Sequence, residues 1–182
     1  MNPKTGFIVL ILLLSLGCSS REKQEAHVMD VISISTDAFE NGGKIPARHT
    51  CDGENISPEL SWGQPPVGTV SLALILDDPD APAGTFVHWT IFNIPPGKTG
   101  FAEGVPKSGV LGDGSIQGVT SYGKSGYSGP CPPPGRPHRY YFKIYALDTT
   151  LGLTVSATKA DIEAAIQGHI LAKGELMGLY GR

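Results

Sequence analysis

Proline and glycine occur throughout this chain and limit the secondary structures that it can form. The 182 residues include 15 prolines and 24 glycines, more than a fifth of all positions, against roughly 12% in an average protein. Proline breaks helix interiors and glycine weakens them. Charged residues make up only 17%, which excludes a coiled coil, and 40% hydrophobic residues exclude a disordered chain. We therefore expect a single folded domain with little helix.

The balance of charge argues against a nucleic-acid partner. The chain has 14 Lys and Arg residues against 17 Asp and Glu residues, a net charge of −3 and an isoelectric point of about 5.9. Domains that bind nucleic acid usually carry a basic patch and a much higher isoelectric point. We predict that this protein binds no nucleic acid.

The amino terminus has the pattern of an export signal. Lys4 supplies a positive charge, and residues 7–16 (FIVLILLLSL) form an apolar stretch. A helix needs about 20 residues to cross the hydrocarbon core of a membrane, so this stretch is too short to span it. An apolar stretch of this length behind a positive residue is typical of a secretory signal peptide.

The end of this stretch resembles the signal of bacterial lipoproteins, in which a small residue precedes a cysteine. Here these two residues are Gly17 and Cys18. The resemblance implies cleavage before Cys18 and attachment of lipid to its thiol and to the new amino terminus. The chain departs from the commonest pattern, because Ser15 and Leu16 stand where a leucine and a small residue are usual. An ordinary signal peptide that is cleaved nearby is the alternative.

These patterns divide the chain into three parts. We expect a signal peptide at residues 1–17, the lipidated cysteine with a polar linker at 18–27, and a folded domain at 28–182. Ser19 follows the cysteine where an aspartate would oppose sorting to the outer membrane. The prediction is an exported protein of the bacterial cell envelope, anchored to the outer membrane, facing the periplasm, and in contact with the membrane only through its lipid.

Two further cysteines remain in the part that would be exported. Cys51 and Cys131 form an even pair in a chain sent to an oxidising compartment, so we predict a disulfide between them. They lie 80 positions apart, and closing so long a loop stabilises a protein by roughly 4 kcal/mol on the chain-entropy model. Two buried free thiols are the alternative.

Four segments have the apolar, aromatic and β-branched composition of strands, and no helical pattern lies between them. This arrangement favours an antiparallel β-sandwich over alternating strands and helices. Two long loops rich in Gly and Pro, 47–66 and 106–137, interrupt it, and loops of that length are usually functional. Trp62 and Trp89 are expected in the core. The predicted strands are residues 28–35, 70–76, 86–94 and 140–147.

One segment near the carboxyl end has the period of an α-helix. We predict a helix over residues 159–171, with Thr158 and Asp161 as a capping pair at its start. His169 lies on its apolar side and is expected to be a packed, hydrogen-bonded core residue. The apolar side consists of Ile162, Ala165, Ile166, His169 and Ile170.

Two segments combine polar side chains with a backbone stiffened by proline. Residues 78–82 (DPDAP) form a corner with two carboxylates, and His88 and Trp89 follow shortly after. Residues 129–140 (GPCPPPGRPHRY) deliver histidine, arginine and tyrosine to the start of a predicted strand. Rigid loops on a β scaffold are where binding sites are usually found.

These sequence motifs, DPDAP, His88-Trp89 and GPCPPPGRPHRY in this order, resemble those of the phosphatidylethanolamine-binding protein family, also called Raf kinase inhibitor-like proteins. The resemblance covers residues 32–182, nearly all of the part after the predicted linker. It is strongest with the compact bacterial and archaeal branch, through residues 50–58 (TCDGENISP) and 129–133 (GPCPP).

The resemblance implies a mainly β fold, an antiparallel Greek-key β-sandwich with a C-terminal α-helix and a small surface cavity that binds anions. Members use the cavity to hold a phosphate or the head group of a phospholipid. We therefore expect a binding protein that is not an enzyme and needs no cofactor. Cys131 stands where many eukaryotic members have proline, so here the disulfide is expected to hold the rim. By their place in the motifs, the ligand-binding residues are Asp78, Asp80, His88, Gly129, Pro130, His138 and Tyr140.

The residue types suit this chemistry. A phosphoryl anion needs hydrogen-bond donors, and histidine is the side chain whose charge changes near neutral pH. A carboxylate that accepts from one imidazole nitrogen fixes the tautomer and raises the pKa of the histidine, which favours the cation. Asp78 or Asp80 paired with His88 or His138 would have this effect.

The sequence leaves open the roles of three further side chains near the predicted cavity. Arg139 either contacts the ligand or pairs with Asp80 inside the protein. Tyr140 either donates its hydroxyl to the ligand or packs within its strand. Tyr180 is a candidate for the tyrosine that closes the cavity in some members of the family.

Other classes of function compete with ligand binding. A hydrolase would combine a histidine and an aspartate with Ser121, Ser125 or Ser128, but the chain lacks a G-x-S-x-G turn. A zinc site would use the two histidines and two aspartates, but no H-E-x-x-H or C-x-x-C spacing occurs, so we predict no metal. An inhibitor of a protease or kinase, acting through its surface loops, is the remaining alternative.

Overall fold

The computed structural model describes residues 30–182. The predicted signal peptide (1–17), the lipidation site at Cys18 and the linker up to residue 27 lie outside this part of the chain. Between residues 30 and 182, no helix has the length and apolar character that crossing a membrane requires.

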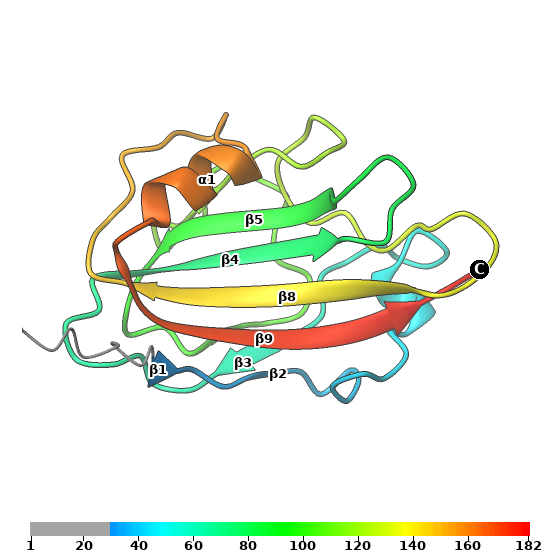
Figure 1. The fold of residues 1–182 in the computed structure, drawn as a ribbon, viewed down its shortest axis with the longest axis horizontal. Helices are drawn as coiled ribbons and strands as arrows, with labels where there is room; N and C mark the ends of the chain where they lie inside the picture. Colours follow the sequence, from blue (N-terminus) through cyan, green and yellow to red (C-terminus); the bar gives the residue numbers. More distant parts are fainter. Residues whose placement is uncertain (1–29) are drawn as a thin grey trace, which may run out of the picture.

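The strands form two sheets, and the described residues contain one α-helix (Figure 1). The mainly β fold with a single helix near the carboxyl end is therefore confirmed. The large sheet has the order β1-β9-β8-β4-β5-β7, with β1 at Asp30–Val31, β4 at Ser71–Asp78, β5 at Phe86–Ile94, β7 at Ile116–Gln117, β8 at His138–Leu147 and β9 at Ile170–Tyr180. The small sheet has the order β2-β3-β6, with β2 at Ile34–Ser35, β3 at Leu60–Trp62 and β6 at Gly100–Phe101. The helices are the 3-10 helix η1 at Ala47–His49 and α1 at Lys159–Ile166.

Apolar side chains cover both faces of the large sheet. On one face the small sheet closes a core that includes Trp62 and Trp89, as predicted. On the other face α1 packs Ile162 and Ile166 against β4 and β5 (Figure 1). Because both faces are covered, every residue of β4 is buried. This explains why residues 71–76 are apolar almost without interruption rather than alternating with polar residues.

The predicted strands at 70–76, 86–94 and 140–147 are confirmed as β4, β5 and β8, but the prediction for residues 28–35 is wrong. Its described part, residues 30–35, forms two short strands in different sheets. β1 pairs with β9 in parallel, so the large sheet is not wholly antiparallel, whereas β2 pairs with β3 in the small sheet. The chain changes sheet between them, because Ile32 donates its N–H to Lys173 of β9 and the Ser33 carbonyl accepts from Gly63 beside β3.

The helix begins where it was predicted and ends earlier. Thr158 and Asp161 form the capping box, but α1 stops at Ile166 and the chain turns at Gly168, which has a φ of 80°. His169 therefore lies beyond the helix, with 46% of its side chain exposed, and its Nδ1 lies 2.7 Å from Asp148 Oδ1. The prediction that His169 belongs to the core is wrong, although it is hydrogen-bonded.

The eleven-residue strand β9 was not predicted from the sequence. Its two glycines, Gly174 and Gly178, weaken the strand pattern, yet the fold requires them. A Cβ at Gly174 would lie 1.9 Å from the Ile32 carbonyl oxygen, and one at Gly178 would lie 2.5 Å from the side chain of Ile45. The glycines therefore allow the amino-terminal segment to pass close to β9.

Burial on both faces of β4 gives a direct test by truncation. Leu74 faces the core under the small sheet and Ile75 faces α1, and neither is exposed. We expect Leu74→Ala and Ile75→Ala each to lower the free energy of unfolding by about 2–5 kcal/mol, measured by urea unfolding. Val67→Ala, at a fully exposed position, is the control and should change little. A loss below about 1 kcal/mol for Ile75→Ala would contradict a packed core beneath the helix.

Candidate ligand-binding pocket

The predicted site residues meet at one end of the large sheet. β4 is antiparallel to both β5 and β8, and β8 is antiparallel to β9. The carboxyl ends of β4 and β9 therefore lie beside the amino ends of β5 and β8. In this register Asp78 is opposite Phe86, and His138 is opposite Tyr180. Residues separated by up to a hundred positions are thus neighbours at this edge.

A β-bulge brings His88 to this site. Leu76 pairs with Trp89, but the next residue of β4, Asp77, pairs with Val87. His88 is the extra residue between them, so the regular alternation of β5 is broken there. The His88 ring centre lies 5.3 Å from that of Tyr140 on β8.

Asp78, His88 and His138 line a cavity of about 340 Å³, and all three residues are buried. The predictions did not include the aromatic wall: Phe86 lay in a predicted strand with no polar group to single it out, and Tyr122 lay in a long loop. The remaining residues around the cavity are Ala81, Pro82, Ala83, Phe86, Tyr122, Cys131, Pro132 and Pro133.

Asp78 holds His138 in a fixed orientation. His138 Nδ1 lies 2.8 Å from Asp78 Oδ2, so Nδ1–H donates to the carboxylate. The other carboxylate oxygen, Oδ1, accepts from the Asp80 N–H at 2.8 Å. The carboxylate is therefore engaged at both oxygens, and the imidazole keeps Nε2 available for a ligand. This is the pairing of an aspartate with a histidine that the sequence predicted.

His88 is held by a backbone carbonyl instead. Its Nδ1 lies 2.7 Å from the Ser128 carbonyl oxygen, and the Ser128 N–H donates to the His88 carbonyl at 3.0 Å. Burial lowers the pKa of His88 below its ordinary value, although the Ser128 carbonyl and the Asp78 charge act in the opposite direction. The ring is thus neutral at neutral pH, with the proton on Nδ1 and the lone pair on Nε2.

Asp80 is paired inside the protein and does not line the cavity. Its carboxylate accepts from Arg139 Nε at 2.9 Å and Nη2 at 2.8 Å, and from the Arg139 backbone N–H at 2.9 Å. These bonds hold the pKa of Asp80 far below its usual range, against the opposing effect of burial. Of the two alternatives for Arg139, the structure therefore shows the pairing with Asp80.

Tyr140 is buried beside both histidines. Its ring stacks on His138 with centroids 6.5 Å apart, so it packs within the strand. Among the described residues its hydroxyl has no hydrogen-bond partner. Burial, together with the nearby Asp78 charge, raises the pKa of Tyr140, so the hydroxyl keeps its proton and can donate it. Tyr140 does not border the cavity, so the structure shows the packing role, and donation to a ligand stays a prediction.

Gly129 and Pro130 lie behind the cavity rim rather than on its surface. The Gly129 N–H donates to Asn55 Oδ1 at 2.7 Å, and the Pro130 carbonyl accepts from the Cys51 N–H at 3.0 Å. A Cβ at Gly129 would lie 2.3 Å from the His49 carbonyl oxygen, so this close approach requires glycine.

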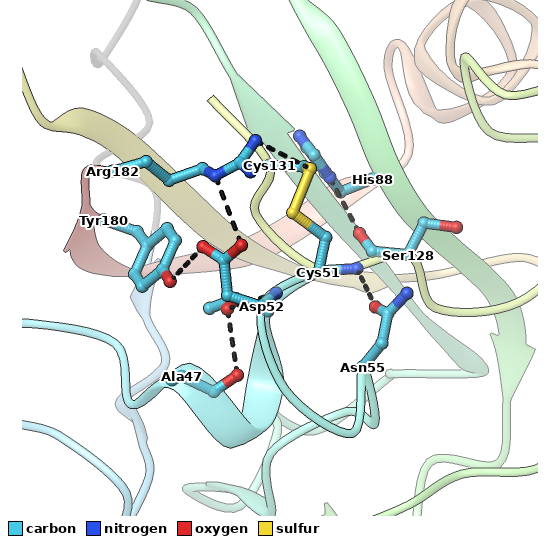
Figure 2. Close-up of a disulfide and its surroundings, with 11 residues drawn as sticks. Ala47, Cys51, Asp52, Asn55, His88, Ser128, Cys131, Tyr180 and Arg182 are labelled. Atoms are coloured by element: carbon cyan, nitrogen blue, oxygen red, sulfur yellow. Dashed lines mark hydrogen bonds and ion pairs between the residues drawn. A yellow bond between two sulfur atoms is a disulfide. The ribbon is translucent and has the colours of Figure 1, made fainter. Parts of the chain in front are cut away.

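The predicted disulfide between Cys51 and Cys131 is present (Figure 2). Cys131 borders the cavity. Tyr180 does not border it: its hydroxyl donates to Asp52 at 2.6 Å, next to the disulfide.

The residues of the two competing site chemistries have these positions. None of the three candidate serines borders the cavity; Ser121 Oγ accepts from the Val87 N–H, and Ser128 contacts His88 through its backbone. Within residues 30–182, no group of three or more His, Cys, Asp or Glu side chains has the geometry to hold a metal ion.

Comparison with known proteins identifies the family. The profile described as phosphatidylethanolamine-binding protein matches residues 35–181. The chain belongs to this family. The family has a curated relative in Methanothermobacter thermautotrophicus, a UPF0098 protein that is 55% identical over 83% of this chain and 99% of its own length. A UPF0098 protein of Aquifex aeolicus is 46% identical over 85% of this chain and 90% of its own.

Solved structures of the family have the same fold. A phosphatidylethanolamine-binding protein homologue from Chlamydia trachomatis is 38% identical, with a TM-score of 0.76, over 84% of this chain and 99% of its own. E. coli YbcL, described as a member of the mammalian family, is 31% identical, with a TM-score of 0.78, over 83% of this chain and 98% of its own.

The pairing of Asp80 with Arg139 predicts a specific response to acid. Because the pKa of Asp80 is lower in the native protein than its unfolded value of about 4, the ionised carboxylate stabilises the fold above that pH. This stabilisation is lost as the pH falls below about 4. Asp80→Asn should therefore be less stable than the wild type at pH 7, and the difference should shrink as the pH is lowered from about 5 to about 2.

The measurement is the free energy of unfolding in urea across this pH range. Asp148→Asn, at an exposed carboxylate that pairs with His169, is the control and should show a much smaller difference at pH 7. A difference between Asp80→Asn and the wild type that stays constant down to pH 2 would contradict the assignment.

Proposed function

We propose that this protein binds phosphoryl anions, without catalysing a reaction, in the cavity formed around Asp78, His88 and His138. The observation that carries the proposal is a pair of buried histidines whose Nδ1 atoms are both engaged within the protein. Each ring therefore has Nε2 left for a ligand in a shared cavity. A protonated Nε2 donates a charge-assisted hydrogen bond to an oxyanion.

The charges around the cavity would respond to such a ligand. Among the described residues, Asp78 is the only carboxylate that borders the cavity, and it is paired with His138. Protonation of His88 would add a positive charge beside this pair. An anion would favour that protonation and raise the lowered pKa of His88. Binding would then take up a proton at His88.

The size and walls of the cavity suit a small phosphoryl compound. A volume of about 340 Å³ is near the lower end for ligand pockets and would hold a phosphoryl group with a short substituent. The walls formed by Pro82, Phe86, Tyr122 and Pro133 are largely apolar and would pack against the substituent of such a compound. The family is named for phosphatidylethanolamine, whose head group is phosphoethanolamine, so that compound is the first probe.

Calorimetric titration of the purified protein tests this proposal. The wild type should bind phosphoethanolamine and inorganic phosphate saturably. His88→Gln and His138→Gln should each weaken binding at least about tenfold, because each removes a charge-assisted hydrogen bond. His169→Gln is the matched control, since this histidine also pairs with a carboxylate but lies on the surface away from the cavity.

Two results would contradict the proposal in different ways. Unchanged affinity in both cavity variants would show that the ligand binds elsewhere. No binding by the wild type would move the function to the exposed loops, as in the alternative of a protease or kinase inhibitor.

Export and lipid anchoring belong to the same proposal. They are supported by the apolar stretch at residues 7–16, by Gly17 and Cys18 at its end, and by a disulfide of the kind that persists in oxidising compartments. The protein would then lie in the bacterial envelope, facing the periplasm from the outer membrane.

Mass spectrometry of the full-length gene product made in a bacterial host tests the anchor. The wild type should lose residues 1–17, carry lipid on Cys18 and fractionate with membranes. Cys18→Ser should lack the lipid and leave the membrane fraction. A Cys18→Ser protein that still carries lipid, or a wild type that carries none, would contradict lipid anchoring.

A further inference from the structure

A loop distant in sequence is fastened to the rim of the cavity. Residues 47–55 form this loop, and residues 127–131 form the segment that it holds. The disulfide joins Cys51 of the loop to Cys131 of the segment (Figure 2). The Cys51 N–H donates to the Pro130 carbonyl at 3.0 Å. One residue thus fastens the loop to the segment both covalently and by a backbone hydrogen bond.

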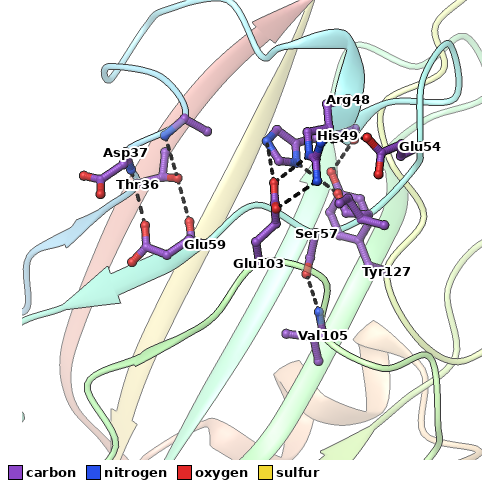
Figure 3. A network of polar contacts seen from close by, with 12 residues as sticks. Thr36, Asp37, Arg48, His49, Glu54, Ser57, Glu59, Glu103, Val105 and Tyr127 are labelled. Carbon is purple, nitrogen blue, oxygen red and sulfur yellow. Dashed lines mark hydrogen bonds and ion pairs between the residues drawn. The ribbon is translucent and has the colours of Figure 1, made fainter.

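Two side-chain hydrogen bonds connect the same two pieces of chain. Asn55 Oδ1 accepts from the Gly129 N–H at 2.7 Å, and the buried Tyr127 hydroxyl donates to the His49 carbonyl at 2.6 Å (Figures 2 and 3). The 127–131 segment therefore contacts the 47–55 loop from its first residue to its last.

The segment in turn holds His88. Ser128 is its second residue, and Ser128 makes both hydrogen bonds to His88, one to the ring Nδ1 and one to the backbone carbonyl. The ring bond fixes which nitrogen carries the proton and where Nε2 points. The orientation of His88 in the cavity thus depends on where the segment lies.

The loop itself is fixed from its other side. Arg48 donates to Glu103, outside the loop, through Nε at 2.9 Å and Nη2 at 3.1 Å (Figure 3). Its Nη1 lies 2.7 Å from Glu54, a pair within the loop itself. Asp52 accepts from the Tyr180 hydroxyl at the end of β9. The loop is therefore anchored to the body of the protein and can serve as a support for the segment.

We propose that the 47–55 loop positions His88 for ligand binding, with Asn55 and the disulfide as its positioning groups, and that reduction of the disulfide weakens ligand binding in the cavity. This inference rests on the proposed function. Cys131 also borders the cavity, so release of the disulfide frees part of the wall as well as the support of His88.

Reduction would proceed by ordinary thiol–disulfide exchange with a dithiol reductant. A thiolate of the reductant attacks one sulfur, the bond between Cys51 and Cys131 breaks, and the second thiol of the reductant resolves the mixed disulfide. The reductant gives up two electrons and two protons and becomes a disulfide, while the protein gains two thiols. Both cysteines are partly exposed, so the reductant can reach them.

The test compares the oxidised wild type, the wild type reduced with dithiothreitol, and Asn55→Gly. Asn55 has a φ of 57°, which glycine adopts freely, so this variant loses the side-chain acceptor and keeps both the backbone and the disulfide. We expect reduction and Asn55→Gly each to weaken phosphoethanolamine binding about three- to tenfold. Both should also shift the ¹⁵N resonance of His88 Nδ1 in the protein without ligand.

Asn93→Gly is the matched control. Asn93 also has a left-handed backbone, with a φ of 55°, and its side chain bonds the Leu151 N–H and carbonyl. It lies near the far end of β5 from His88. Its loss should change neither phosphoethanolamine affinity nor the His88 resonance.

The outcomes separate this inference from the proposed function. If the oxidised wild type does not bind phosphoethanolamine, the proposed function fails, and the His88 resonance still tests the positioning. If alkylation and mass spectrometry show that the disulfide is fully reduced, and neither the phosphoethanolamine affinity nor the His88 resonance changes, the inference is overturned. If the reduced protein unfolds, the Asn55→Gly variant tests the positioning of His88 instead, because it keeps the disulfide. An unchanged His88 resonance in that variant overturns the inference.

Discussion

The pocket depends on the hydrogen bonding of β4 to β5 on one side and to β8 on the other. This pairing sets Asp78 at the end of β4, beside the amino end of β5, where His88 is the third residue, and beside His138, the first residue of β8. A strand buried on both faces has little freedom to move, since each side chain is packed in a dense core. The polar groups of the pocket are therefore placed by a tightly packed strand. The β-bulge in β5 interrupts the regular alternation of side chains and so brings His88 to the same place.

Burial of polar groups at this edge is tolerated because nearly all of them have partners. Asp78 uses both carboxylate oxygens, and each histidine uses Nδ1. The Tyr140 hydroxyl is an exception among the described residues. Buried polar groups that lack a partner are costly in free energy.

The sequence predicted β4, β5 and β8, the helix start and the polar groups of the cavity, because these features are local or belong to short motifs. These three strands are rich in apolar, aromatic and β-branched residues, and Thr158 with Asp161 is a recognisable cap. The prediction failed for β9, where glycines allow another segment to approach, and for residues 28–35, whose described part divides between two sheets. The bulge at His88 and the approach of Tyr122 are set by tertiary packing, so neither has a signal along the chain.

The parallel pairing of β1 with β9 has a consequence for how the molecule is oriented. Asp30 is opposite Ala172, near the start of β9, whereas the pocket lies by Tyr180 at its end. Eight residues of extended strand separate these points, a distance of about 26 Å. The described chain therefore begins at one end of the large sheet, and the cavity lies at the opposite end. Figure 1 shows β1 and the carboxyl end of β9 at these two ends. A protein held by its amino terminus would present this pocket outward, toward ligands that arrive from the surrounding solution.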